Sequence, residues 1–352
     1  MRWCAAAVIA VAVVCAGPVA RGQDVEVPGP ESCVVMPVWQ PLTALSGAGG
    51  QFLPLIVVGD PNGTPPDSIA AHVDPNTLAS VHAGVGSVRN IYPGGSYVFG
   101  TGTLISPRHI LTAAHVFDVN DDGVSDFDLS ATKFRLNLTP SIDLSVVAVD
   151  LHPDFTGFAN PDINDDLAII TLAEDVPTGV PWYPLWREEI GGGQATRQVG
   201  YGRSGNGRTG YLTTGSIMVK RFGHNSVDVG FLDDEGSGEI EVWVADFDDP
   251  LRGYGLLGGS TLGNDIETTL GPGDSGGPSF VSFEGDLYII ATNTFSLSWF
   301  AAPDAPLFDS GLGGILVYPY LAWIDSIVPE PATLALLAIG AALTLAGRRR
   351  RR

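Results

Sequence analysis

A histidine, an aspartate and a serine each stand in a short segment whose neighbours suit nucleophilic catalysis. His115 follows an apolar, strand-like run and the small residues Thr-Ala-Ala, which place its imidazole at a strand end. Asp166 directly precedes the apolar run Leu-Ala-Ile, and Asp165 competes with it for the same role. Ser275 stands in the glycine-rich segment 271–278. A serine hydroxyl attacks an amide when an imidazole takes its proton and a carboxylate orients that imidazole, so the three residues predict a catalytic triad.

Glycines on both sides of Ser275 allow a strained turn and the close approach of a substrate to backbone N–H groups. The N–H groups of Gly273 and Ser275 are therefore predicted to form an oxyanion hole. The same segment fits the Gly-x-Ser-x-Gly elbow of α/β-hydrolases, whose triad runs in the order Ser, Asp, His. All six histidines precede Ser275, so the chain cannot supply that order.

The segments Leu-Thr-Ala-Ala-His115, Asp166-Leu-Ala and Gly-Asp-Ser275-Gly-Gly-Pro resemble the motifs of trypsin/chymotrypsin-like serine peptidases. The resemblance implies an all-β fold of two antiparallel six-stranded barrels (chymotrypsin-like) with the active site in the cleft between them. The first barrel is expected at about residues 81–178 and the second at about 179–327. Short β-branched and aromatic runs among 45 glycines and 26 prolines independently favour an all-β structure.

The resemblance also bears on specificity and activation. The residue six positions before the nucleophile forms the base of the specificity pocket, and here it is Thr269 rather than the aspartate of trypsin-type enzymes. We therefore expect no preference for Lys or Arg, with Thr292 and Thr294 lining the same pocket. Many members of the family are activated when a freshly cut N-terminus pairs with the aspartate before the nucleophile, here Asp274. Residues 56–59 resemble such a start only weakly, and the sequence leaves activation open.

An acidic segment after His115 places oxygen ligands at alternate positions around a glycine, as in the first half of a calcium loop. The predicted ligands are Asp118, Asn120, Asp122, the carbonyl of Val124, and Asp126. Position 12 of the loop is Leu129 instead of glutamate, so Asp128 or another segment would have to complete the shell. The alternative is an exposed acidic turn. Such an ion would be structural, because the chemistry of the triad requires no cofactor.

Both ends of the chain have the sequence features of export signals. Residues 1–22 combine a basic start, an apolar run and small residues at a cleavage site, which predicts a signal peptide removed by signal peptidase. Residues 328–352 hold Pro-Glu-Pro, an uncharged apolar stretch and five arginines. This tail resembles the PEP-CTERM sorting signal, which implies removal by an exosortase-type enzyme. A permanent tail anchor is the alternative, and membrane contact is expected only through this tail before processing.

The part between the two signals is strongly acidic. The ends contain seven of the 18 basic residues and one of the 39 acidic ones, which leaves 11 basic and 38 acidic residues, a difference of −27. This charge excludes nucleic acid and anionic membrane surfaces as partners. Cys33 is the one cysteine outside the signal peptide, so stability must come from a core rather than from an internal disulfide. Residues 23–80, rich in Pro and Gly, are expected to form a propeptide-like arm, ordered in part at best, before a peptidase domain at 81–327.

These observations predict a serine endopeptidase that is exported from a bacterium and is either secreted or held at the cell surface or in the extracellular matrix. It would hydrolyse protein or peptide substrates through an acyl-enzyme intermediate. The alternative is a catalytically silent adhesion protein of the cell surface or matrix, built on a peptidase scaffold.

Overall fold

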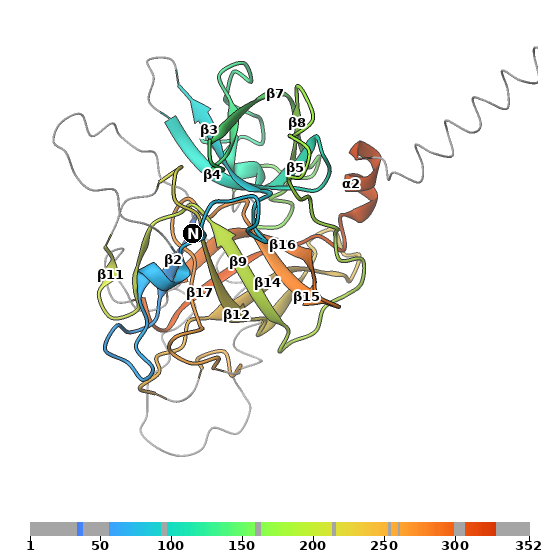
Figure 1. The fold of residues 1–352 in the computed structure, drawn as a ribbon. Helices are drawn as coiled ribbons and strands as arrows, with labels where there is room; N and C mark the ends of the chain where they lie inside the picture. The colour runs from blue at the N-terminus through green and yellow to red at the C-terminus, as the bar shows by residue number, and fades with distance from the viewer. Residues whose placement is uncertain are drawn as a thin grey trace, which may run out of the picture.

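The structure is a computed structural model that describes residues 34–37, 56–92, 97–158, 163–212, 216–252, 255–259, 261–298 and 307–328. Both predicted export signals lie outside these residues, apart from Val328. Figure 1 shows two lobes, one made of strands β3 to β8 and the other of strands β9 to β17. In the described part of the chain no helix is long and apolar enough to cross a membrane.

The first lobe is a closed antiparallel barrel of six strands in the order β3-β4-β5-β8-β7-β6. Alternate residues point into it, as Phe134 and Leu136 do from β6 while their neighbours are partly exposed. The short helix η3 (Ala114–Val116) follows β5 directly. The strands are β3 (Val85–Ile91), β4 (Tyr97–Leu104), β5 (His109–Thr112), β6 (Lys133–Leu136), β7 (Ile142–Leu151) and β8 (Ala168–Leu172).

The second lobe is an antiparallel sheet in the order β12-β9-β15-β16-β17-β14-β13, with β1 added to β16. Its two outer strands, β12 and β13, are separated only by Val227 and Asp228. The N–H of Val227 donates to Gln194 O and that of Asp228 to Val244 O, both at 3.0 Å, which continues the ladders on either side. With β12 and β13 counted as one bent strand, the sheet closes on itself with six strands. The expected two-barrel, all-β fold is confirmed.

Large apolar side chains, Trp243, Phe280 and Phe295 among them, fill the second barrel. Helix α2 (Leu321–Ile327) follows β17, near the end of the described residues. The strands of this lobe are β1 (Val34–Pro37), β9 (Ala195–Gly200), β12 (Arg221–Ser226), β13 (Val229–Leu232), β14 (Ile240–Asp246), β15 (Pro278–Phe283), β16 (Asp286–Ser298) and β17 (Ser310–Leu316).

Residues 56–80 belong to the predicted propeptide-like arm, and this part of it packs against the second lobe. Strand β2 (Ile56–Val58) is fully buried and runs parallel to β10 (Ser204–Asn206), which also pairs with β11 (Gly210–Tyr211). Val57 exchanges two backbone hydrogen bonds with Thr269, at 3.2 and 3.1 Å. The β-branched run Ile-Val-Val offers apolar surface and free backbone groups, and burying these against the second lobe outweighs the flexibility of the flanking Pro- and Gly-rich sequence. The short helix η2 (Ile69–His72) follows.

A buried charged network ties this segment to the second barrel. The carboxylate of Asp74 accepts a hydrogen bond from His82 Nδ1 at 3.0 Å and another from the Ser80 hydroxyl, and it lies 3.5 Å from Lys220 Nζ. Lys220 also donates to the carbonyl of His82 at 2.6 Å. Burial acts to raise the pKa of Asp74, but the hydrogen bond from His82 and the charge of Lys220 outweigh it and hold the pKa well below its usual value. Burial lowers the pKa of Lys220 to about 8.

Asp74→Asn should therefore destabilise the protein by about 3–5 kcal/mol, because it leaves the Lys220 ammonium buried without its countercharge. Guanidinium unfolding at neutral pH measures the loss. Asp143→Asn is the matched control, since Asp143 pairs with Arg135 and Arg89 on the surface, and about 1 kcal/mol or less is expected there. Equal losses in the two variants would show that the network does not hold the segment.

Candidate active site

His115 lies on η3, directly after β5, where the chain leaves the first barrel. The two alanines before it are fully buried, and such small side chains let the turn sit close to the barrel. The imidazole is also buried, with the ring of Phe158 edge-on at 5.1 Å between centroids. The histidine is thus held at a strand end, as the sequence predicts.

The three predicted triad side chains form one chain of hydrogen bonds. His115 Nδ1 donates to Asp166 Oδ2 at 2.6 Å, and Ser275 Oγ donates to His115 Nε2 at 2.8 Å. The backbone N–H of His115 donates to the other carboxylate oxygen of Asp166 at 2.8 Å, so this carboxylate fixes both the ring and the backbone that carries it. Asp166 is buried immediately before β8. Asp165, its competitor, instead lies 3.0 Å from His152.

The turn around Ser275 adopts backbone angles that only glycine tolerates easily. Gly273 has φ +106° and Gly276 has φ +76°. A Cβ on Gly276 would lie 2.0 Å from the hydroxyl oxygen of Thr112 and 2.5 Å from the carbonyl of Thr101, both in the first barrel. The glycines therefore let a turn of the second barrel press against the strands that lead to His115.

Thr101 of β4 holds this turn across the interface between the barrels. Its N–H donates to the carbonyl of Ser275 at 2.7 Å, and its hydroxyl donates to the carbonyl of Gly273 at 3.0 Å. The N–H groups of Gly273 and Ser275 donate to no acceptor among the described residues. Both carbonyls are used while both N–H groups stay free, which is the condition that an oxyanion hole requires.

Asp274 anchors the same turn from inside the second barrel. Its carboxylate is fully buried and accepts hydrogen bonds from the N–H groups of Gly202 at 2.7 Å and Gly271 at 2.9 Å. Burial raises the pKa of Asp274 to about 7, although these hydrogen bonds and the charge of Arg221 act to lower it. Ile56, the start of the segment that weakly resembles an activation terminus, is buried, and its carbonyl accepts the hydroxyl of Ser204.

The three threonines predicted for the specificity pocket are all buried. The hydroxyls of Thr269, Thr292 and Thr294 have no hydrogen-bond partner among the described residues. A buried hydroxyl without a partner costs about 1–3 kcal/mol, so each of the three indicates a place that a polar ligand or water would satisfy.

The predicted calcium loop follows η3. Asp118 is fully buried, and its carboxylate accepts the N–H groups of Asp122 at 3.2 Å and Gly123 at 2.7 Å. Asp122 accepts the N–H of Val124 at 3.0 Å, and Asp126 accepts that of Val119 at 2.6 Å. The loop thus turns around its acidic side chains. It does not belong to either group of described His and acidic residues whose ligand atoms lie within 4.8 Å of one another.

Both of those groups contain Asp165, and sequence reasoning missed them. One consists of His152, Asp154 and Asp165, and the other of Asp165, Glu235 and Glu241. Their members come from separate loops and strands with no common motif, so only the tertiary fold reveals that they lie together.

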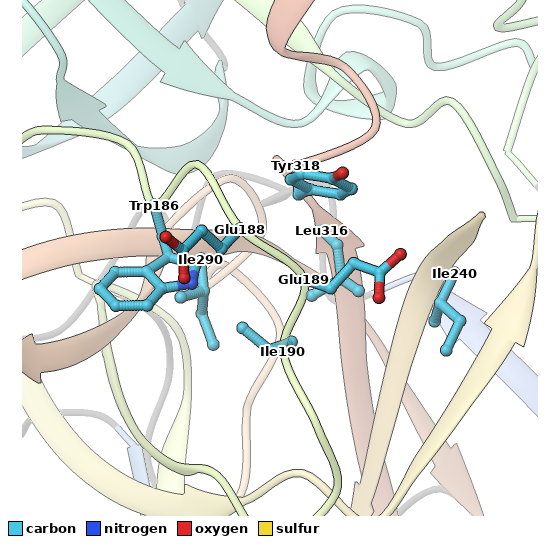
Figure 2. Close-up of a pocket in the computed structure, with 8 residues that line it drawn as sticks. All are labelled: Trp186, Glu188, Glu189, Ile190, Ile240, Ile290, Leu316 and Tyr318. Atoms are coloured by element: carbon cyan, nitrogen blue, oxygen red, sulfur yellow. The ribbon is translucent and has the colours of Figure 1, made fainter.

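Figure 2 shows a pocket that none of the triad residues lines. Ile190, Ile240, Ile290 and Leu316 provide apolar walls, and the segment that joins the barrels adds Glu188 and Glu189. Trp186 and Tyr318 complete its lining. Because no triad or predicted pocket residue lines it, the pocket does not bear on the hydrogen-bond chain of Ser275.

Two family models match parts of this chain. Residues 82–223 match the family model for trypsin, and residues 328–351 match the PEP-CTERM protein-sorting motif. The chain carries a trypsin-type domain and a PEP-CTERM sorting motif. The resemblance inferred from the sequence is thereby confirmed. The trypsin match includes His115 and Asp166 but ends before Ser275, whose assignment depends on its motif and its geometry.

Two curated serine proteases are similar to part of the trypsin-type domain. Over 75 residues the chain is 39% identical to "Serine protease Hayan" of Drosophila melanogaster, which covers 21% of this chain and 11% of the relative. Over 85 residues it is 33% identical to "Venom serine protease Bi-VSP" of Bombus ignitus, covering 24% of this chain and 22% of the relative. The chain thus spans only about a tenth and a fifth of these relatives. The similarity supports a serine protease family.

Proposed function

We propose that the protein is an exported serine endopeptidase that hydrolyses peptide bonds with Asp166, His115 and Ser275. The observation that carries this proposal is the continuous chain of hydrogen bonds, 2.6 Å from Asp166 to His115 and 2.8 Å from His115 to Ser275. Such a chain is required to generate an alkoxide-like nucleophile at neutral pH.

The proposed reaction passes through an acyl-enzyme. His115 Nε2 takes the proton of Ser275 as Oγ attacks the scissile carbonyl, and the N–H groups of Gly273 and Ser275 stabilise the resulting oxyanion. His115 then gives the proton to the leaving amine, and water hydrolyses the ester with His115 again as the base. Asp166 holds Nδ1 protonated and stabilises the imidazolium in both steps.

The proposed processing and location of the protein depend on the sequence signals at the two ends of the chain. The PEP-CTERM motif at 328–351 supports sorting and cleavage by an exosortase-type enzyme, and residues 1–22 support removal by signal peptidase. The product would act on protein substrates outside the cell or at its surface. Its acidity supports neither a nucleic-acid partner nor membrane contact beyond the tail.

A catalytically silent adhesion protein on the same scaffold is the second candidate. The full burial of the Ser275 side chain favours it, because a nucleophile must be reached by substrate.

Fluorophosphonate labelling separates the two candidates. The correctly processed wild-type protein should label and cleave casein, and Ser275→Ala should do neither. Asp166→Asn should lower kcat about 10⁴-fold, because the imidazole loses its orienting acceptor. Ser282→Ala, a serine exposed on β15, is the control and should label like the wild type. A wild-type protein that neither labels nor cleaves would favour the silent scaffold.

We also propose that Thr269, Thr292 and Thr294 line a pocket for small, apolar or mildly polar side chains. Their partnerless hydroxyls support it. Thr269→Asp should raise kcat/KM for Arg-containing over Ala-containing peptides by about 10-fold or more, since a carboxylate at the pocket base attracts a cationic side chain. Cleavage profiling of a peptide library measures the change, and Thr269→Ser, which keeps the hydroxyl, should leave the profile as it is. An unchanged profile in a Thr269→Asp protein that still labels would remove Thr269 from the pocket.

The loop at 118–126 is proposed to bind a structural calcium ion. The buried Asp118 carboxylate, already held by two loop N–H groups, supports a preformed turn. Calcium should raise Tm, and Asp122→Asn should reduce that rise, because it removes one charged ligand. Thermal unfolding in EDTA and in excess Ca²⁺ tests this, with the exposed Asp175→Asn as control. A calcium response in Asp122→Asn equal to that of the wild type would contradict the loop site.

A further inference from the structure

Three carboxylates from different parts of the chain meet where the two barrels join. Asp165 lies in the loop before β8 in the first barrel, Glu241 stands on β14 of the second, and Glu235 lies in the hairpin between β13 and β14. One carboxylate oxygen of each lies within 4.8 Å of the others. Asp165 is 4% exposed and Glu241 6% exposed, whereas Glu235 is open to solvent. The cluster therefore reaches from the interior to the surface.

This negative charge is poorly compensated. Among the described residues, the one basic side chain that pairs with any of the three is His152, 3.0 Å from Asp165. Tyr320 adds a neutral contact, since its hydroxyl oxygen accepts the N–H of Asp165 at 3.0 Å. Burial, with repulsion from Asp165, raises the pKa of Glu241 to about 8 and that of Glu235 to about 7.

A second observation points to a ligand independently of the clustering. Oxygen Oε2 of Glu241 is buried and has no hydrogen-bond partner among the described residues. A buried carboxylate oxygen without a donor is strongly unfavourable, and native structures avoid it unless an ion or water fills the place. The carboxylate to which it belongs is one of the three that converge.

We propose that Asp165, Glu235 and Glu241 bind a calcium ion. Calcium takes six to eight oxygen ligands at about 2.3–2.6 Å, so two oxygens that share the ion lie no more than about 5 Å apart, as these do. All three ligands are oxygens, whereas zinc favours nitrogen and sulfur, and magnesium demands a near-ideal octahedron with several waters. The exposed side of Glu235 leaves room for water to complete the shell.

The ion would link the barrels beside the triad. Asp165 and Asp166 are consecutive, and Asp165 has φ +60°, so the two carboxylates leave the chain in different directions, one toward Glu241 and the other toward His115. Binding at Asp165 would fix the peptide that carries Asp166. This inference does not rest on the proposed peptidase function, because it concerns metal binding and stability.

Thermal unfolding of the full chain with EDTA and with Ca²⁺ tests the site. At 100 times the Kd, calcium should raise the Tm of the wild type by about 5–10 °C. Glu241→Gln should lose the share of that rise that does not depend on the loop at 118–126, yet in EDTA its Tm should equal or exceed that of the wild type, because an amide of the same size relieves the repulsion. Glu239→Gln, the same change on the same hairpin outside the cluster, should respond like the wild type.

Terbium luminescence gives a readout at the site itself. Terbium replaces calcium in oxygen sites, and excitation of Tyr320, which contacts Glu241, should sensitise its emission. Glu241→Gln and Glu235→Gln should each reduce this emission and weaken calcium competition at least 10-fold. Because Glu235 is exposed, Glu235→Gln can replace Glu241→Gln in this test if Glu241→Gln does not fold.

Asp122→Asn separates this site from the loop after His115. A calcium response that remains in Asp122→Asn and is lost when Glu241→Gln is added to it supports the three-carboxylate site, whether or not the loop also binds calcium. A response lost only in Asp122→Asn, an equal response in Glu241→Gln and Glu239→Gln, or a Tm raised by Zn²⁺ or Mn²⁺ but not by Ca²⁺ would each overturn it.

Discussion

The hydrogen bond from Ser275 to His115 depends on two barrels keeping one fixed relation, because the two residues come from different lobes. A 2.8 Å contact leaves little tolerance for sliding between the lobes. Thr101 supplies the restraint, since it bonds the carbonyls on both sides of Asp274 from a strand of the first barrel. Gly276 makes the approach feasible, because any side chain there would collide with that barrel.

The buried carboxylates described above differ in the groups that contact them. This difference distinguishes carboxylates that stabilise the fold from those that take part in chemistry. Asp274 is held by two backbone N–H groups and keeps the nucleophile turn in place. Asp74 is held by a lysine and a histidine and fastens residues 56–80 to the second barrel. Asp166 is held by the ring and the N–H of His115, so its charge is directed at the base. Glu241 keeps one oxygen without a hydrogen-bond partner among the described residues, which is one of the observations behind the proposed calcium site.

The sequence was sufficient for the features that local chemistry determines. The motifs around His115 and Ser275 and the apolar run after Asp166 predicted which side chains meet, and short strands among glycines predicted the all-β fold. Asp166 was predicted over its competitor Asp165 because it directly precedes the apolar run Leu-Ala-Ile. The structure brings Asp166 to His115, whereas Asp165, which has φ +60°, lies 3.0 Å from His152.

What could not be predicted depends on contacts between distant segments. Residues 56–58 look like part of a Pro- and Gly-rich arm, and their burial becomes intelligible only when β10 and Thr269 are placed beside them. Glu235 and Glu241 belong to an acidic hairpin whose sequence is typical of a solvated turn. Nothing near them in sequence predicts a contact with Asp165. Their meeting requires both barrels to have formed. An ion bound there would therefore stabilise the same interface on which the contact between His115 and Ser275 depends, which couples the stability of the assembled barrels to the geometry of the triad.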